Sequence, residues 1–469
     1  MAESGRTKVS RNKKDIISEL PGNIHENILG FLPIQDAVRT SILSTTWRHS
    51  WKRIPHLIFE DEFLNRMMDK LIQDCDFKIK AFKLVSVINN ILLLHNGPIA
   101  SFSLTIPTDE CDSRIIHDYI DQWIPLLARK NIKQLSLEDW MLGEFTAPHF
   151  SSLGLTHLRL VSFWFSYTSA SGGFTYLTNI ELIDVAMSKQ CIFDCPVLEK
   201  LTLVVCTGLS HTNFHAPNLK CLHQMCDEIS LAGFENLGLE NLTEFSCGLL
   251  YCLAELEPSE TSNLVKVLCS LHKIEKIYIA AEFIQYLAGG GSPKKLPKPL
   301  HYLKTLNISD INLVDLDVIS CLLCLIRSAP NLCNLNISAE IWTEFLVYED
   351  CLKDYRVEDF DDFTMDQLEI VTFGYFKGCR AELELVKFLL AHAPVLKTVF
   401  IHRIKAVKKD VSLMIAEEML QYTRASSRAQ IRYLEQPVVD IYTRIAAHGM
   451  GLASCNIGYQ TGVNKSHKP

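Results

Sequence analysis

The sequence is poor in the features that mark membrane, secreted and nucleic-acid-binding proteins. No uncharged apolar run approaches the roughly 18 residues that a membrane-spanning helix needs, and no charged-then-apolar signal segment opens the chain. We therefore expect an intracellular protein, in the nucleus, the cytoplasm or both. Its 16 cysteines are expected to be reduced and buried, because disulfides are rare inside cells.

Signature motifs of several large enzyme classes are also absent. The chain contains no G-x-x-x-x-G-K-[ST], G-x-G-x-x-G, H-E-x-x-H or G-x-S-x-G motif. His211 and His215 form an H-x-x-x-H without a nearby carboxylate, and Cys321 and Cys324 form a sole C-x-x-C inside an apolar run. We therefore predict no catalytic residue, no metal site and no cofactor.

Charge is modest and unevenly placed. The net charge is -8, whereas the N-terminal arm, residues 1–14, is basic. The remainder is therefore more acidic still, which argues against a general nucleic-acid binder. The arm fits either a nuclear address or, as we favour, a disordered leader.

The chain is long and rich in apolar residues. Its 469 residues, 48% of them apolar, indicate a folded protein that exceeds what one core usually organises. We therefore expect two or more units, or an array of repeats.

Residues 15–60 predict three short helices around apolar anchors. The first is expected to end before Pro33, the second to begin near Asp36 as its N-cap, and the third to start at Ser44. A unit of about 45 residues cannot enclose so many apolar side chains, so part of its apolar face should bind a partner. The anchors are Ile24, Ile28, Leu29 and Leu32 in the first helix, Ala37, Val38, Ile42 and Leu43 in the second, and Trp47 and Trp51 in the third.

This segment resembles the F-box of plant F-box proteins, in the form that is followed by leucine-rich repeats. Ile24-His25 and Thr45-Thr46 depart from the usual pattern, and both substitutions look tolerable. The resemblance implies docking to the Skp-type adaptor of a cullin-based (SCF) ubiquitin ligase; the alternative is a helical domain packed wholly onto the rest of the chain. The resemblance is carried by Leu20-Pro21, Ile28-Leu29, Leu32-Pro33, Asp36 to Ser41, Leu43-Ser44, Trp47-Arg48 and Trp51. The residues that we predict to bind the adaptor are Leu20, Pro21, Ile24, Ile28, Leu32, Pro33, Val38, Leu43 and Trp47.

Beyond this segment, the phrase aliphatic-x-x-aliphatic-x-aliphatic recurs along the chain. From Leu155 the copies start 22, 21, 21 and 23 residues apart, and later intervals run from 28 to 36. The early spacing matches leucine-rich repeats, in which stacked repeats bury a shared core. An ordinary α/β domain with leucine-rich strands is the alternative. The copies start at Ile132, Leu155, Leu177, Leu198, Leu219, Leu242, Ile274, Leu303, Leu332, Leu368 and Leu396, with a possible earlier one at Ile99.

In each copy, the residue between the last two apolar positions should face away from the core, because side chains alternate along a strand. We call these residues the outward row, and we expect it to lie on the concave surface of a horseshoe, where such solenoids bind partners. Its mixed charge and size suit a protein or peptide. The row is Ser136, Arg159, Glu181, Thr202, His223, Ser246, Tyr278, Asn307, Asn336, Thr372 and Phe400, of which Arg159, Glu181, Thr202, His223, Tyr278, Asn307 and Asn336 are our candidate substrate-binding residues.

Four aromatic residues follow the copy at Leu155: Phe163, Trp164, Phe165 and Tyr167. They suit an interface and equally a cap on the convex side.

The closing region resembles the FBD region that ends many plant F-box proteins with leucine-rich repeats. The resemblance is carried by QLEIVTFGYFKGCRAELELVKFLLAHAPVLKTVFI, which starts at Gln367. The following MIAEEMLQYTRASSRAQIRYL predicts an amphipathic helix and its exit. The acidic segment 349–362 is interpreted as a solvated excursion.

The predicted fold class is α/β: a small three-helix F-box, then a leucine-rich-repeat solenoid capped by an FBD-type terminal repeat. The expected function is substrate recognition for an SCF-type ligase, without catalysis, with a Skp-type adaptor and an unknown protein substrate as partners. The alternative is a leucine-rich-repeat scaffold or small-ligand sensor that recruits no ligase. The expected divisions are the arm 1–14, the F-box 15–60, the repeats 61–365, the FBD cap 366–436 and the tail 437–469, which matches no pattern.

Overall fold

The computed structural model forms two compact units, Met1–Cys195 and Pro196–Pro469, which are described separately. The predicted arm 1–14, the acidic segment 349–362, the tail 437–469 and Leu43 lie outside the described residues. The structure describes residues 17–435 apart from 18, 43–44, 46, 69–75, 108–111, 147–152, 167–173, 189–190, 210–211, 227–236, 250–264, 290–293, 314, 340–362, 406 and 408.

The first unit opens with the predicted helical segment, and its helix boundaries differ from expectation. The second helix begins at Ile34 directly after Pro33, so Asp36 lies within its first turn and is not its N-cap. Asp36 instead pairs with Arg39 at 2.9 Å and with Arg66 at 2.5 Å. The third piece contains a 3-10 helix over Trp47–Arg53, and Ser44, its predicted start, lies outside the described residues. The elements are α1 (Gly22–Gly30), α2 (Ile34–Arg39), η1 (Thr40–Ile42) and η2 (Trp47–Arg53).

A parallel sheet follows, with strand order β1-β2-β3-β4-β5 and β6 paired to β4. Its first strand already lies inside the segment 15–60. Helix α4 begins after Asp76, whose carboxylate accepts a hydrogen bond from the backbone N–H of Lys78 at 3.0 Å. The elements are β1 (His56–Phe59), α3 (Asp61–Met68), α4 (Phe77–Leu94), β2 (Ser101–Ile106), α5 (Ser113–Arg129), β3 (Gln134–Thr146), β4 (His157–Ser166), β5 (Asn179–Ile183), β6 (Ala186–Met187) and β7 (Ile192–Asp194).

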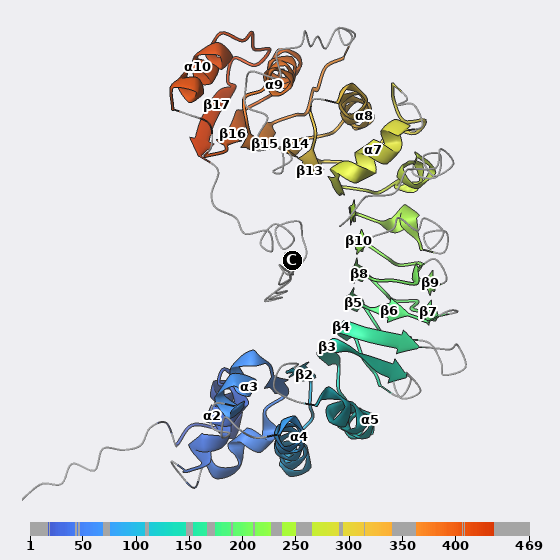
Figure 1. Cartoon of the computed structure of the whole chain (residues 1–469), viewed down its shortest axis with the longest axis vertical. Coiled ribbons are helices and arrows are strands. Elements are labelled where there is room, and N and C mark those ends of the chain that lie inside the picture. The colour runs from blue at the N-terminus through green and yellow to red at the C-terminus, as the bar shows by residue number, and fades with distance from the viewer. Residues whose placement is uncertain are drawn as a thin grey trace, which may run out of the picture. The chain divides into compact units, whose positions relative to one another are not determined.

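The second unit repeats one strand per copy of the aliphatic phrase. Strands β8 and β10 to β17 pair in parallel in chain order, and Figure 1 shows α7, α8 and α9 along one side of β12 to β16. The elements are β8 (Lys200–Val204), β9 (Asn213–His215), β10 (Cys221–Cys226), η7 (Leu239–Asn241), β11 (Glu244–Leu249), β12 (Lys276–Ala280), α7 (Ala281–Gly289), β13 (Thr305–Ile311), α8 (Leu316–Arg327), β14 (Asn334–Ala339), β15 (Ile370–Phe376), α9 (Arg380–His392), β16 (Thr398–Arg403), α10 (Lys409–Leu420) and β17 (Gln430–Glu435).

The core of each repeat consists of the aliphatic positions of the recurring phrase. In the copy at Leu303, the residues Leu303, Leu306 and Ile308 are all buried, whereas Asn307 between the last two is half-buried. The same alternation recurs from strand to strand and confirms the predicted repeat solenoid. The amphipathic helix that we expected near the end is α10, but its exit forms a further strand, β17, that the repeat pattern did not reveal.

A buried carboxylate in the first turn of α9 holds the loop between β15 and α9. Glu382 accepts hydrogen bonds from the backbone N–H groups of Lys377 at 3.0 Å, Gly378 at 2.6 Å and Cys379 at 3.0 Å. Gly378 has a φ of +81°, and a Cβ there would lie 2.1 Å from Cδ1 of Ile415 in α10. This position therefore requires glycine, both for its backbone conformation and for the close packing of α10.

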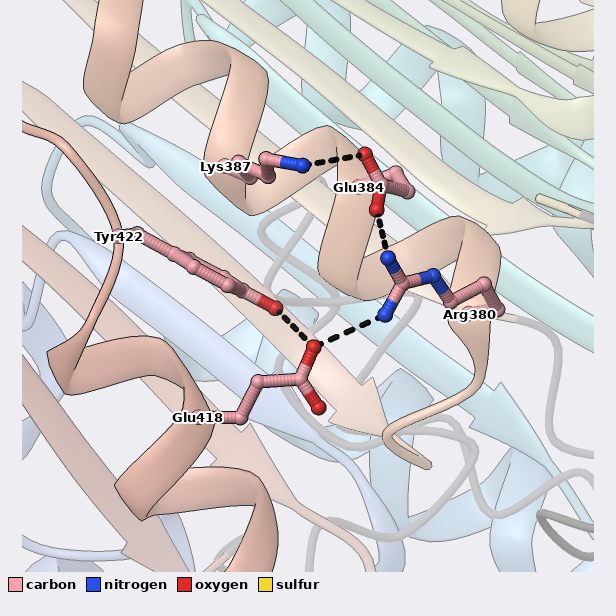
Figure 2. A network of polar contacts seen from close by, with 5 residues as sticks. All are labelled: Arg380, Glu384, Lys387, Glu418 and Tyr422. Carbon is pink, nitrogen blue, oxygen red and sulfur yellow. Dashed lines mark hydrogen bonds and ion pairs between the residues drawn. The ribbon is translucent and has the colours of Figure 1, made fainter. Parts of the chain in front are cut away.

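Helices α9 and α10 are also joined by a polar network (Figure 2). Arg380 contacts Glu384 on its own helix and Glu418 on α10, the latter at 2.9 Å. Lys387 pairs with Glu384 at 3.3 Å, and the Tyr422 hydroxyl donates to Glu418 at 2.9 Å. This network attaches the last helix to the helix before it.

Candidate functional site

Large apolar side chains are exposed on the predicted F-box segment. Ile24 and Ile28 lie one turn apart on the exposed side of α1, and Leu32 in the following turn is 40% exposed. Phe31 and Ile42 are more exposed to solvent, at 89% and 85% respectively. These five exposed apolar side chains make the segment a candidate docking surface.

His25 accounts for the outward direction of the α1 side chains. Its ring is buried against Trp47, with 4.5 Å between ring centroids, and its Nε2 donates a hydrogen bond to the Ile17 carbonyl at 2.7 Å. Leu29, four residues later, is buried on the same side of the helix. Ile24 and Ile28, each one residue before a buried position, are therefore left on a neighbouring, solvent-exposed side of the helix.

The other predicted adaptor-binding residues are divided between surface and core. Pro21 is exposed, and Leu20, Pro33 and Val38 are half-buried. Trp47 is only 9% exposed, so it belongs to the core of the segment.

Two exposed residues, Phe31 and Ile42, were missing from the predicted docking set. Phe31 precedes Leu32-Pro33 and lies three residues after Ile28. That helical spacing indicates that Phe31 lies on the same side as Ile28. For Ile42 the sequence offers no such signal, because its exposure depends on where helix α2 ends.

The outward row is in register along each unit. In the first unit Ser136 pairs with Arg159 and Arg159 with Glu181. In the second unit every predicted member, from Thr202 to Phe400, pairs directly with the next. The structure adds Ile58 and Ser103 at the start of the first unit's row and Arg432 at the end of the second's.

In the first unit, the row is built around Arg159. Its guanidinium lies 3.2 Å from Glu138 and 3.7 Å from Glu181, on the strands at either side. Because two carboxylates flank one cation, this part of the row is more acidic than its single arginine suggests.

In the second unit, His223 lies beside two charged residues. It is 1% exposed, and burial lowers the pKa of its imidazole while Glu244 acts in the opposite direction. Glu244 lies 3.6 Å from both His223 Nε2 and Lys276 Nζ. Burial also raises the pKa of the Tyr278 hydroxyl.

The aromatic cluster after Leu155 is largely structural. Phe163 and Phe165 lie within β4 and are fully buried, whereas Trp164 between them is exposed. Tyr167 lies outside the described residues. Among the three described members, Trp164 alone is exposed to solvent.

Within the described part of the chain, no group of three or more histidine, cysteine or acidic residues could hold a metal ion. Among the same residues, no helix is both long and apolar enough to cross a bilayer.

Comparison with known proteins finds three matching family models. The F-box domain matches residues 17–59, the LRR repeats of FBD-associated F-box protein At5g56370 match residues 120–337, and FBD matches residues 365–401.

Similar proteins come from Arabidopsis thaliana. F-box/FBD/LRR-repeat protein At1g13570 is 34% identical over 433 residues, covering 90% of this chain and 99% of that protein. F-box/FBD/LRR-repeat protein At5g22660 is 24% identical, covering 91% and 98% respectively. F-box/LRR-repeat protein At3g03360 is 25% identical, covering 58% and 60%.

Proposed function

The chain belongs to the plant F-box/FBD/LRR-repeat family, and from this membership we propose that it is the substrate-recognition subunit of an SCF-type E3 ubiquitin ligase. Its F-box would bind the Skp-type adaptor, and its repeats would bind a protein substrate. F-box proteins generally act as such substrate adaptors. The observation that carries the proposal is the set of exposed apolar side chains on the F-box: Ile24, Ile28, Phe31, Leu32 and Ile42.

The energetics of the F-box support this assignment. Its core is completed by Leu29, Ile34, Ala37, Trp47 and Trp51, all of which are buried. The exposed apolar residues are therefore not needed to close that core. Covering them with a partner would remove apolar area from water, which stabilises a complex by about 25 cal/mol per Å².

The proposed role needs no catalytic group in this chain. A ligase assembled on the adaptor would carry ubiquitin as a thioester, and the repeats would hold the acceptor lysine near it. Holding two reactants together replaces a bimolecular encounter by an intramolecular one, which is itself a large rate effect.

The test is a binding measurement between the purified full chain and a purified Skp-type adaptor. We expect the double change Ile28→Ala and Leu32→Ala to weaken binding by about 2 kcal/mol, roughly 30-fold in Kd. The matched control is Leu413→Ala with Met414→Ala, because these two side chains are also apolar and exposed but lie on α10.

The control pair should bind the adaptor like the wild type. Failure of the folded wild-type chain to bind would refute the proposal and favour a scaffold or small-ligand sensor. Equal loss in both double variants would show that the effect is not specific to the F-box.

A further inference from the structure

The outward positions of strands β13 to β16 that alternate with buried aliphatic residues carry no formal charge; Asp310 lies beyond them, in the β-bulge at the end of β13. Two or three side chains per strand face this side, because they alternate with the buried aliphatic residues. His402 is the one titratable histidine of the set, and burial lowers the pKa of its imidazole, which favours the neutral form. The set is Thr305 and Asn307 on β13, Asn334, Asn336 and Ser338 on β14, Ile370 and Thr372 on β15, and Thr398, Phe400 and His402 on β16.

The earlier strands of the same unit differ in this respect. On this side, β8 carries Lys200, β11 carries Glu244 and β12 carries Lys276. The change to amides and hydroxyls after β12 therefore defines a separate surface, which we call the neutral face. A surface without cations is poorly suited to phosphate groups or nucleic acid.

Two amides lie side by side at the centre of the neutral face. Asn307 and Asn336 are register partners, and Asn336 Nδ2 donates a hydrogen bond to Asn307 Oδ1 at 2.5 Å. Among the described residues, this is the one side-chain hydrogen bond that either makes. It fixes both amide groups, leaving the Asn307 NH2 group as a donor and Asn336 Oδ1 as an acceptor.

An adjacent donor and acceptor match the main chain of an extended peptide. In a strand, the C=O and N–H of one residue point to the same side, as they do in each hydrogen-bonded pair of an antiparallel ladder. The Asn307 NH2 group can donate to that C=O, and Asn336 Oδ1 can accept from that N–H. Backbone recognition of this type gives affinity without requiring a particular side chain.

Aromatic residues flank the two amides on both sides: Tyr278 on β12, the strand directly before the neutral face, and Phe400 on β16, its last strand. The register runs from Tyr278 through Asn307, Asn336 and Thr372 to Phe400. Four strand spacings amount to roughly 19 Å, and an extended chain covers that distance in about six residues. On the next strand, the guanidinium of Arg432 lies 5.5 Å from the centroid of the Phe400 ring. This cation–π contact holds the Phe400 ring in place.

We propose that the neutral face binds an extended, uncharged peptide segment of the substrate, about six residues long and with an apolar side chain near each end. The segment lies across the strands, its apolar ends against Tyr278 and Phe400 and its main chain on Asn307 and Asn336. This inference rests on the proposed function only in calling the ligand a substrate.

The experiment uses displayed random 12-residue peptides selected on the immobilised full chain. Enriched peptides are synthesised, labelled and titrated against the wild type and two double variants. Asn307→Ala with Asn336→Ala should weaken binding at least tenfold. Gln134→Ala with Asn179→Ala is the matched control, since it removes two amides from the same side of β3 and β5, and it should leave the affinity unchanged.

A second variant, Phe400→Ala, tests the direction of the peptide. It should relax the preference for an apolar residue at one end of the selected peptides only. Selection of highly charged peptides, equal losses in the two double variants, or no enriched peptide at all would overturn the inference. Adaptor binding is measured separately on each variant, so a failure of the ligase proposal is distinguished from a failure of this one.

Discussion

The buried carboxylate of Glu382 makes a quantitative prediction about the C-terminal cap. Burial raises its pKa from the ordinary 4.5 to about 7, although three backbone N–H donors act in the opposite direction. The perturbation is Glu382→Gln, which keeps an acceptor oxygen but cannot titrate. Comparing the two chains at a series of pH values isolates this one carboxyl group.

The sign follows from the two pKa values. The folded chain has the higher pKa and so binds the proton more tightly than the unfolded chain. Its contribution to stability is fully present below about pH 4.5 and is lost as the pH rises to about 7. The gap between 4.5 and about 7 corresponds to about 3 kcal/mol, or at most about 300-fold in an opening equilibrium.

The assay is hydrogen exchange of the α9 amides, residues Arg380–His392, followed by mass spectrometry. We expect the protection of the wild type relative to Glu382→Gln to fall by up to about 100-fold between pH 4.5 and pH 8. Comparison at equal pH removes the pH dependence of exchange itself. The control is Glu417→Gln, an exposed carboxylate in α10, for which the ratio should stay constant.

A ratio that is flat for Glu382→Gln as well would show that this carboxyl group does not titrate in the window. A ratio that rises with pH would mean that the three N–H donors outweigh burial. Either result would refute the reasoning from desolvation.

Two further predictions separate core from surface. Trp47→Ala should destabilise the F-box by about 3 to 5 kcal/mol, because it removes a buried ring. Leu32→Ala should barely change the thermal unfolding of the F-box. An unchanged melting curve for Trp47→Ala would contradict the place of this side chain in the core. Arg380→Ala should weaken the attachment of α10 by only about 1 kcal/mol, because the ion pairs of Arg380 are partly exposed. The variant should be cleaved faster by protease than the wild type, and added salt should reduce that difference in rate. A difference that does not depend on salt would argue against an ionic origin.

The register of the repeats could be predicted from the sequence, because it depends on the local spacing of aliphatic residues. The aliphatic spacing specifies which strand residues are buried, and a shift of one residue would expose all of them. The predicted outward row is therefore the row that the pairing shows within each unit. Strand β17 could not be predicted in this way, because its residues lack the aliphatic phrase. It forms by pairing with β16.

Helix boundaries in the F-box were less predictable. Asp36 has the right chemistry for an N-cap, but Pro33 precedes the first turn and Arg66, thirty residues later, binds the carboxylate. The number of exposed anchors likewise depended on a distant contact, that of His25 with Trp47, which turns Ile24 and Ile28 to solvent.

The sequence by itself determined the order of the F-box, repeats and FBD region, and which side of each strand is buried, because motif and alternation are properties of neighbouring residues. Only the tertiary structure decided which apolar F-box side chains remain exposed. It also decided that Asn307 and Asn336, 29 residues apart, share a hydrogen bond, and that Glu382 is enclosed beside α10. These features depend on packing between segments that are distant in the chain, and no local pattern records such packing.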